Sequence, residues 1–274
     1  MRIGVVAPST PIEPAVAERV GALAAALYPR VELVFHPQCF FSHGHFAGSD
    51  VERLAALVEV ANDPGFGALW CARGGYGSCR IAEQAIAALA PVARDKAYLG
   101  YSDAGFLLAG LYRAGFPHVV QGPMAKDVVR DGGEAAIARV LAWMVKRSPG
   151  GLEPSLASGE PAAAFNLTVL SQLLGTALEP DLGGHVLMLE EVSEHMYRID
   201  RTFFHVTSNA AIRRVSGVRL GRVGEVPAND PDFAQSEEEI ARFWCARAGI
   251  AYLGRADIGH DAANKLVPFG AFSG

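Results

Sequence analysis

Short apolar runs alternate with longer segments of helical periodicity through the first half of the chain. The runs have the length of buried strands, and the longer segments repeat apolar residues every three or four positions, as amphipathic helices do. One segment, residues 50–61, has Asp50 in position to cap its N-terminus. The pattern predicts strands at 2–7, 31–35, 68–72, 97–101 and 119–121, and helices at 15–27, 50–61, 81–90, 104–114 and 134–146.

The alternation of strands and helices indicates parallel βαβ units and a doubly wound sheet of the flavodoxin or Rossmann type. It stops at residues 147–161, where three Pro, three Gly and three Ser in fifteen residues indicate a linker. A smaller and less regular half follows. There the pattern predicts helices at 167–174, 199–208 and 236–248, with strands at 186–190, 215–220 and 250–253. We therefore expect an α/β domain at 1–146, a linker at 147–165 and a smaller mixed α/β domain at 166–274.

Composition narrows the classes of protein that this chain can represent. The net charge is −5 and no run of five or more basic residues occurs, which argues against nucleic-acid binding. No apolar stretch reaches the roughly 18 residues of a membrane span, and the N-terminal apolar run is too short for a secretory signal. Four cysteines lack metal-ligand spacing, so we interpret them as free thiols in a reducing cytoplasm: Cys39, Cys71, Cys79 and Cys245.

A serine stands where a predicted strand passes directly into a helix. Ser102 follows the strand 97–101, and ligands bind beyond the carboxyl ends of strands in such sheets. A serine at a sharp strand-to-helix turn exposes its hydroxyl near the positive end of the helix. The sequence Gly-Tyr-Ser-Asp-Ala departs from the Gly-x-Ser-x-Gly pattern, however. Ser102 is thus either a nucleophile or an ordinary helix cap.

A glycine-rich loop, Arg73-Gly-Gly-Tyr-Gly, follows the strand 68–72. Paired glycines let the backbone approach a ligand and direct N–H groups into a cleft. The loop lacks the ending of a P-loop and the spacing of a dinucleotide fingerprint. It suits an oxyanion better than a phosphate, although an ordinary tight turn stays open. Arg73 is a candidate anchor for a carboxylate, because a guanidinium binds such groups through two parallel hydrogen bonds.

Carboxylates and a histidine complete the candidate chemistry. The strand 186–190 ends in Glu190 and Glu191, and either could orient an imidazole or lie in a solvated turn. His260, beside Gly259, is suited to reach into a cleft. The alternating pair His43 and His45 lacks further ligands of a metal site, so we predict no metal.

Together these segments resemble the LD-carboxypeptidase family of serine peptidases, which includes the microcin C self-immunity peptidases. The resemblance covers most of the chain in order, through Ala7-Pro-Ser, Arg73-Gly-Gly-Tyr-Gly with Arg80, Gly100-Tyr-Ser-Asp, Gly122-Pro-Met, Asn166-Leu, Leu189-Glu-Glu-Val-Ser-Glu, Tyr197-Arg-Ile-Asp-Arg and Gly259-His. It implies a triad of Ser102, Glu190 and His260. It also implies a C-terminal domain able to swivel, with the active site between the two domains.

The same resemblance implies roles for further residues. Oxyanion donors fall on the backbone N–H groups of Gly75 and Asp103. Apart from the resemblance, we expect substrate contacts at four residues: Arg73, Gly74, Tyr101 and Asn166. The implied protein is a cytoplasmic homodimer without metal or organic cofactor, which removes terminal D-Ala from murein tetrapeptides during cell-wall recycling.

Two other functions stay open: a microcin C immunity-type peptidase and a non-catalytic protein that binds a small ligand. The chain departs from the family pattern where Ala164-Phe165 replaces Gly-Gly, a change expected to narrow the pocket or alter a backbone contact. It departs again at Leu266-Val-Pro-Phe-Gly, after which it stops soon, so that further C-terminal strands are not expected.

Overall fold

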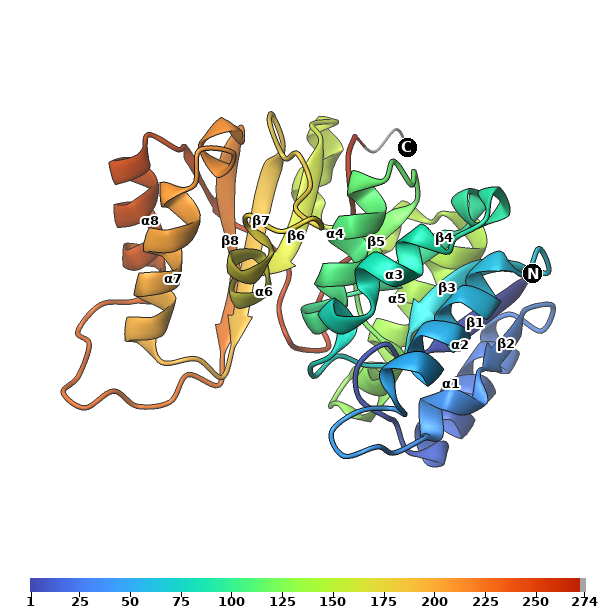
Figure 1. The fold of residues 1–274 in the computed structure, drawn as a ribbon. Helices are drawn as coiled ribbons and strands as arrows, with labels where there is room; N and C mark the ends of the chain where they lie inside the picture. The colour runs from blue at the N-terminus through green and yellow to red at the C-terminus, as the bar shows by residue number, and fades with distance from the viewer. Residues whose placement is uncertain (272–274) are drawn as a thin grey trace.

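Two separate β-sheets organise the chain. The computed structural model describes residues 1–271. The larger sheet lies in the N-terminal part and the smaller one in the C-terminal part, with the helices α7 and α8 on the outer side of the smaller sheet (Figure 1).

The larger sheet has the strand order β10-β5-β4-β3-β1-β2. Its first five strands in the chain are parallel and run in the order 2-1-3-4-5, a doubly wound arrangement of the flavodoxin type, as predicted. The strands are β1 (Arg2–Val6), β2 (Glu32–Phe35), β3 (Phe66–Cys71), β4 (Ala97–Gly100), β5 (Val119–Gln121) and β10 (Val267–Pro268).

Helices cover both faces of this sheet. Buried residues of α1 and α5 share one hydrophobic cluster, and those of α2, α3 and α4 belong to another. These helices are α1 (Pro14–Leu27), α2 (Asp50–Asn62), α3 (Ala82–Ala87), α4 (Gly105–Arg113) and α5 (Gly133–Lys146). Short 3₁₀ helices occupy connections: η1 (Pro37–Phe40), η2 (Ser78–Arg80), η3 (Pro91–Asp95), η4 (Ser102–Ala104), η5 (Ala125–Val129), η6 (Pro149–Gly151), η7 (Pro154–Ser158) and η8 (Ile212–Arg214).

The predicted cap of α2 is wrong by one residue. Ser49, not Asp50, is the N-cap, and it forms a capping box with Glu52. The Ser49 N–H donates to the Glu52 carboxylate at 2.7 Å. Asp50 is already helical and accepts from Arg80 Nε at 2.9 Å, so its carboxylate joins α2 to η2.

The smaller sheet is parallel, in the order β6-β7-β8-β9. Its strands are β6 (Ala162–Asn166), β7 (Val186–Val192), β8 (Gly217–Gly224) and β9 (Tyr252–Arg255), and its helices are α6 (Leu167–Leu173), α7 (Met196–Ser208) and α8 (Glu237–Ala248). The assignment of residues 162–165 to the linker is wrong, because they belong to β6. The rest of the predicted domain division stays a prediction.

The C-terminal segment returns to the larger sheet. Strand β10 pairs antiparallel with β5, so that Val267 faces Gln121. The next residues reach the smaller sheet, since Gly270 forms a bridge with Ala162 of β6. This segment therefore ties the two sheets to each other.

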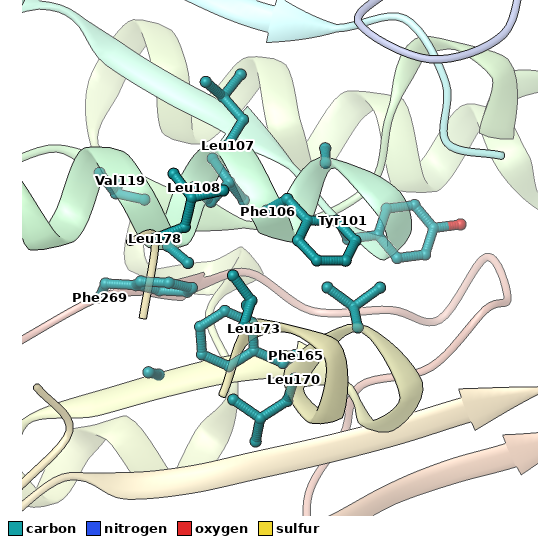
Figure 2. Close-up of a cluster of buried hydrophobic side chains, with 14 of the residues drawn as sticks. Tyr101, Phe106, Leu107, Leu108, Val119, Phe165, Leu170, Leu173, Leu178 and Phe269 are labelled. Atoms are coloured by element: carbon teal, nitrogen blue, oxygen red, sulfur yellow. The ribbon is translucent and has the colours of Figure 1, made fainter. Parts of the chain in front are cut away.

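A continuous hydrophobic cluster fills the junction between the two halves (Figure 2). Gly105 of α4 allows the close approach of α6, since a Cβ at this position would lie 3.0 Å from Val169 Cγ1. Phe165 is 2% exposed, and its ring meets the edge of Phe269 at 5.1 Å between centroids. The Phe165 side chain thus packs in the core between the halves rather than narrowing a pocket.

No helix within residues 1–271 is long and apolar enough to cross a membrane. All four cysteines are free, and Cys39, Cys71 and Cys245 are buried.

Replacing Phe165 by Ala is expected to lower the free energy of unfolding by about 3–5 kcal/mol, because it leaves a cavity in the core between the halves. Urea denaturation measures the loss. Phe243→Ala is the control, since this ring is 52% exposed on α8 and its removal should cost much less. An equal decrease in the free energy of unfolding of the two variants would contradict the conclusion that Phe165 packs in the core between the halves.

Candidate active site

Ser102 lies in a strained turn between β4 and α4. Its φ is 57°, a left-handed conformation that a serine seldom adopts. Gly100 makes the turn possible, since a Cβ there would lie 2.9 Å from the Cβ of Ala104. Neither η4 nor α4 receives a side-chain cap from Ser102, so the alternative of a helix cap is wrong. The turn instead presents the hydroxyl as a nucleophile elbow does.

The imidazole of His260 joins the serine to a carboxylate. His260 Nε2 lies 2.9 Å from Ser102 Oγ, and His260 Nδ1 lies 2.5 Å from Glu190 Oε2. Glu190 stands on β7 and is 1% exposed. The structure thus brings three sequence-predicted residues into one hydrogen-bonded series, with the distances that nucleophile, base and orienting acid require.

Successive residues of a strand point to opposite sides, which separates the two glutamates of β7. Glu191 accepts hydrogen bonds from Asn166 Nδ2 at 2.6 Å and from the Thr168 N–H at 2.9 Å. Burial disfavours its charge and raises the pKa of Glu191, although these donors oppose the shift. Glu191 therefore supports the start of α6 and does not contact the histidine.

Two opposing effects act on the charge of His260. Burial favours the neutral imidazole, whereas the charge and hydrogen bond of Glu190 favour the imidazolium. The net result is that the pKa of His260 is raised. Glu190 thus stabilises the protonated state that a general base must pass through.

The loop that carries His260 is held from both halves of the chain. On one side, Arg222 of β8 donates to Asp257 and to Asp261, which flank the histidine. On the other side, Asn264 accepts from the Gly259 N–H at 3.2 Å and from Gln121 Nε2 of β5 at 3.3 Å. Sequence reasoning missed these residues, although the two aspartates on either side of Gly259-His260 were a visible signal.

The glycine-rich loop lies against the Ser102 hydroxyl. A Cβ at Gly74 would lie 3.1 Å from Ser102 Oγ, and Gly75 has a φ of 112°. Thr10 Oγ1 donates to the Gly74 carbonyl at 2.6 Å. The buried Asp103 carboxylate accepts from the Ser78 N–H at 2.9 Å, which ties this loop to the turn that holds Ser102. Glycine is therefore required where the loop approaches the serine.

Two cavities of opposite character meet at Ser102 and Gly75. The larger, about 520 Å³, we call the acidic cavity; its charged lining consists of Glu83, Asp103, Glu191 and Glu194. The smaller, about 180 Å³, we call the basic cavity; its charged lining consists of Arg73, Lys126, Asp127 and Arg130, and Tyr101 and His260 also line it.

The cavities divide the predicted substrate contacts between them. Arg73, Gly74 and Tyr101 line the basic cavity, and Asn166 lines the acidic one. Tyr101 also donates to Asp127 Oδ1 at 2.9 Å, with its ring 4.9 Å from the His260 ring. Lys126 and Arg130 were missed, because they lie in a turn without periodicity or motif.

Within the described part of the chain, no group of three or more His, Cys, Asp or Glu is arranged to hold a metal. His45 instead lies against the rings of Phe46 and Tyr76, at 5.4 and 6.3 Å between centroids.

The chain resembles known proteins over nearly its whole length. Residues 3–122 match the family model of the LD-carboxypeptidase N-terminal domain, and residues 162–273 match that of the C-terminal domain. A Streptomyces coelicolor protein named as a carboxypeptidase is 32% identical over 98% of this chain and 88% of its own. The murein tetrapeptide carboxypeptidase of Pseudomonas aeruginosa is 27% identical over 82% of this chain and 78% of its own.

Solved structures share the fold. The muramoyltetrapeptide carboxypeptidase from Oxalobacter formigenes superposes with a TM-score of 0.82 at 23% identity, covering 98% of this chain and 93% of the other. The microcin C7 self-immunity protein in its wild-type apo state has a TM-score of 0.77 at 17% identity, covering 98% and 91%.

The strain at Ser102 can be measured with two variants that both lack the hydroxyl. Ser102→Gly is expected to be more stable than Ser102→Ala by about 1 kcal/mol, because only glycine adopts a positive φ without cost. Urea unfolding of the pair gives the difference. Because glycine is more flexible than alanine when unfolded, a result in which Ser102→Ala is the more stable variant would show that the turn is not strained.

Proposed function

Because the chain belongs to the LD-carboxypeptidase family and is a serine carboxypeptidase, we propose that it hydrolyses the L,D-peptide bond that releases terminal D-Ala from murein tetrapeptides. The observation that carries the proposal is the position of His260, within hydrogen-bond distance of both Ser102 and Glu190. Murein peptides are the substrates in the names of the Pseudomonas and Oxalobacter proteins. In this role the enzyme serves the recycling of cell-wall peptides.

The reaction proceeds as acyl transfer through the triad. His260 Nε2 takes the proton of Ser102 as Oγ attacks the scissile carbonyl carbon, and Glu190 holds the imidazole in the tautomer with its proton on Nδ1. The tetrahedral intermediate collapses as the C–N bond breaks, and His260 gives the proton to the amine of the leaving D-Ala. A water molecule, deprotonated by His260, then hydrolyses the acyl-enzyme.

The developing oxyanion is held by the backbone N–H groups of Gly75 and Asp103. Gly74 supports this role, since its lack of a side chain lets the loop backbone lie beside Ser102. Asp103 directly follows the nucleophile, as the residue that provides a donor does in nucleophile elbows. Each such donor contributes about 3 kcal/mol to lowering the barrier.

The charges of the two cavities orient the peptide across Ser102. The terminal carboxylate of D-Ala lies in the basic cavity, where Arg73 binds it and Gly74 and Tyr101 border it. The acyl part, whose diamino acid carries an ammonium group, extends into the acidic cavity past Asn166. Asn166 is itself held by Glu191, at 2.6 Å, so its amide is fixed in direction.

The remaining parts of the proposal concern the setting of the enzyme. Free thiols at all four cysteines are consistent with a reducing compartment, and we propose the cytoplasm. A homodimer without metal or organic cofactor stays a prediction drawn from the family resemblance.

The substrate is tested by incubating the protein with defined L,D- and L,L-tetrapeptides and a processed microcin analogue, and reading the products by mass. We expect loss of one D-Ala from the L,D-peptide, and a fluorophosphonate label on Ser102. Ser102→Ala should lower kcat on the order of 10⁶-fold without loss of fold. Near-normal turnover in that variant would refute the nucleophile, and cleavage of the microcin analogue alone would favour the immunity-type function.

The raised pKa of His260 predicts the pH dependence. His260 must be neutral to act as a base, so kcat/KM falls as the pH drops below that pKa, at a pH above the ordinary imidazole value of about 6.5. Glu190→Gln removes the charge that raises the pKa. The acidic limb should therefore move to lower pH, and kcat should fall by about 10⁴-fold because the tautomer is no longer held.

The control for this experiment is Glu18→Gln, a change of an exposed glutamate on α1. Its pH profile should match that of the wild type. An acidic limb that stays in place in Glu190→Gln would contradict the coupling of the two side chains.

A further inference from the structure

We infer that Arg130 is the second guanidinium that binds the carboxylate of the leaving residue, and that it makes the enzyme specific for peptides with a free C-terminus. The inference rests on the proposed function, because it names the contact that selects the leaving residue. It begins from the basic cavity, which opens beside Ser102 and His260 and has three cationic side chains in its wall against one carboxylate.

The three cations are not equally available to a ligand. Lys126 forms an ion pair with Glu13, and this bond lowers the pKa of Glu13. Arg73 donates through Nη1 to the Pro11 carbonyl, at 3.3 Å. Arg130 donates through Nε to Asp127 Oδ1 at 2.8 Å and remains 36% exposed. Its guanidinium also interacts with the Tyr101 hydroxyl, but it has five N–H donors, so donors remain for a second partner such as a carboxylate.

Asp127 holds Arg130 in place and connects it to the nucleophile. This carboxylate is 5% exposed. Its Oδ2 accepts from the Met124 N–H at 2.8 Å, and its Oδ1 also accepts from the hydroxyl of Tyr101. Tyr101 directly precedes Ser102, so the position of Arg130 is set relative to the reacting serine through two hydrogen bonds.

The backbone before and after Arg130 is also fixed. The Lys126 N–H donates to the Ala72 carbonyl at 2.9 Å, and the Arg130 N–H donates to the Asp127 carbonyl at 3.0 Å. Gly133 lets the turn close, since a Cβ there would lie 2.0 Å from the Asp127 carbonyl oxygen. Arg130 is thus presented by a rigid turn, and an ordered donor loses less entropy when it binds a ligand.

The size of the basic cavity agrees with a single small leaving residue. Its volume is about 180 Å³, against about 520 Å³ for the acidic cavity. The smaller cavity therefore suits a small leaving residue such as alanine better than a larger group.

The test compares an L,D-tetrapeptide acid with its C-terminal amide in wild type, Arg130→Gln and Arg130→Lys. We expect the wild type to prefer the acid. Arg130→Gln should lower kcat/KM for the acid by about 10- to 100-fold, as the loss of a hydrogen bond to a charged group predicts, and leave the amide within about threefold. The kcat/KM of Arg130→Lys for the acid should lie between the values of the wild type and Arg130→Gln, because an ammonium cannot form the two parallel hydrogen bonds of a guanidinium. Arg242→Gln, on the exposed face of α8, is the control.

A second readout does not depend on cleavage of the tetrapeptide. D-Alanine should protect Ser102 of the wild type from a fluorophosphonate probe better than D-alaninamide does, and Arg130→Gln should remove this difference. Arg130→Lys serves in its place if urea unfolding shows that Arg130→Gln does not fold.

Each outcome decides between the two proposals. The role of Arg130 would be overturned if the substitutions lowered kcat/KM equally for the acid and the amide. It would also be overturned if they left the protection of Ser102 by D-alanine unchanged. If the wild type cleaves no tetrapeptide yet is protected by D-alanine through Arg130, the proposed substrate fails and the carboxylate site stands.

Discussion

The whole arrangement depends on one imidazole that hydrogen-bonds to two parts of the chain at the same time. Ser102 lies 158 residues before His260, at the end of a strand of the larger sheet, and Glu190 lies 70 residues before it, on the smaller sheet. Both bonds require the two sheets to keep their relative position. The continuous core around Phe165 and Phe269 meets that requirement, because close-packed interiors resist displacement.

The histidine itself depends on the return of the C-terminal segment to the larger sheet. The loop that carries His260 begins after β9 of the smaller sheet and ends at β10 of the larger sheet, so it connects the two sheets. Arg222 holds it from β8, while Arg139 of α5 donates to the Asn264 carbonyl at 3.1 Å from the opposite side. A loop that is held from both sheets thus places His260 next to Ser102.

Local patterns predicted most elements of the fold, and could not predict what joins them. Short stretches of sequence are enough to predict the alternating strands and helices, the turn at Ser102 and the glycine-rich loop. Strand β6 was missed because the run Ala162–Asn166 is short and directly follows a segment rich in Pro, Gly and Ser. Contacts across 158 residues leave no spacing to detect, so the triad came from the family resemblance. Arg130 and Asp127 were indicated neither by a local pattern nor by the family resemblance.

Buried carboxylates position nearly every functional group at this site. Asp103 holds the glycine loop, Asp127 holds Arg130 and Tyr101, and Glu191 holds Asn166. Burying such charges costs free energy that hydrogen bonds must offset, so their value lies more in positioning than in stability. Glu190 differs from the others. Its Oε1 is buried and has no hydrogen-bond partner among the described residues. Its Oε2 hydrogen-bonds to His260, and its charge favours the imidazolium.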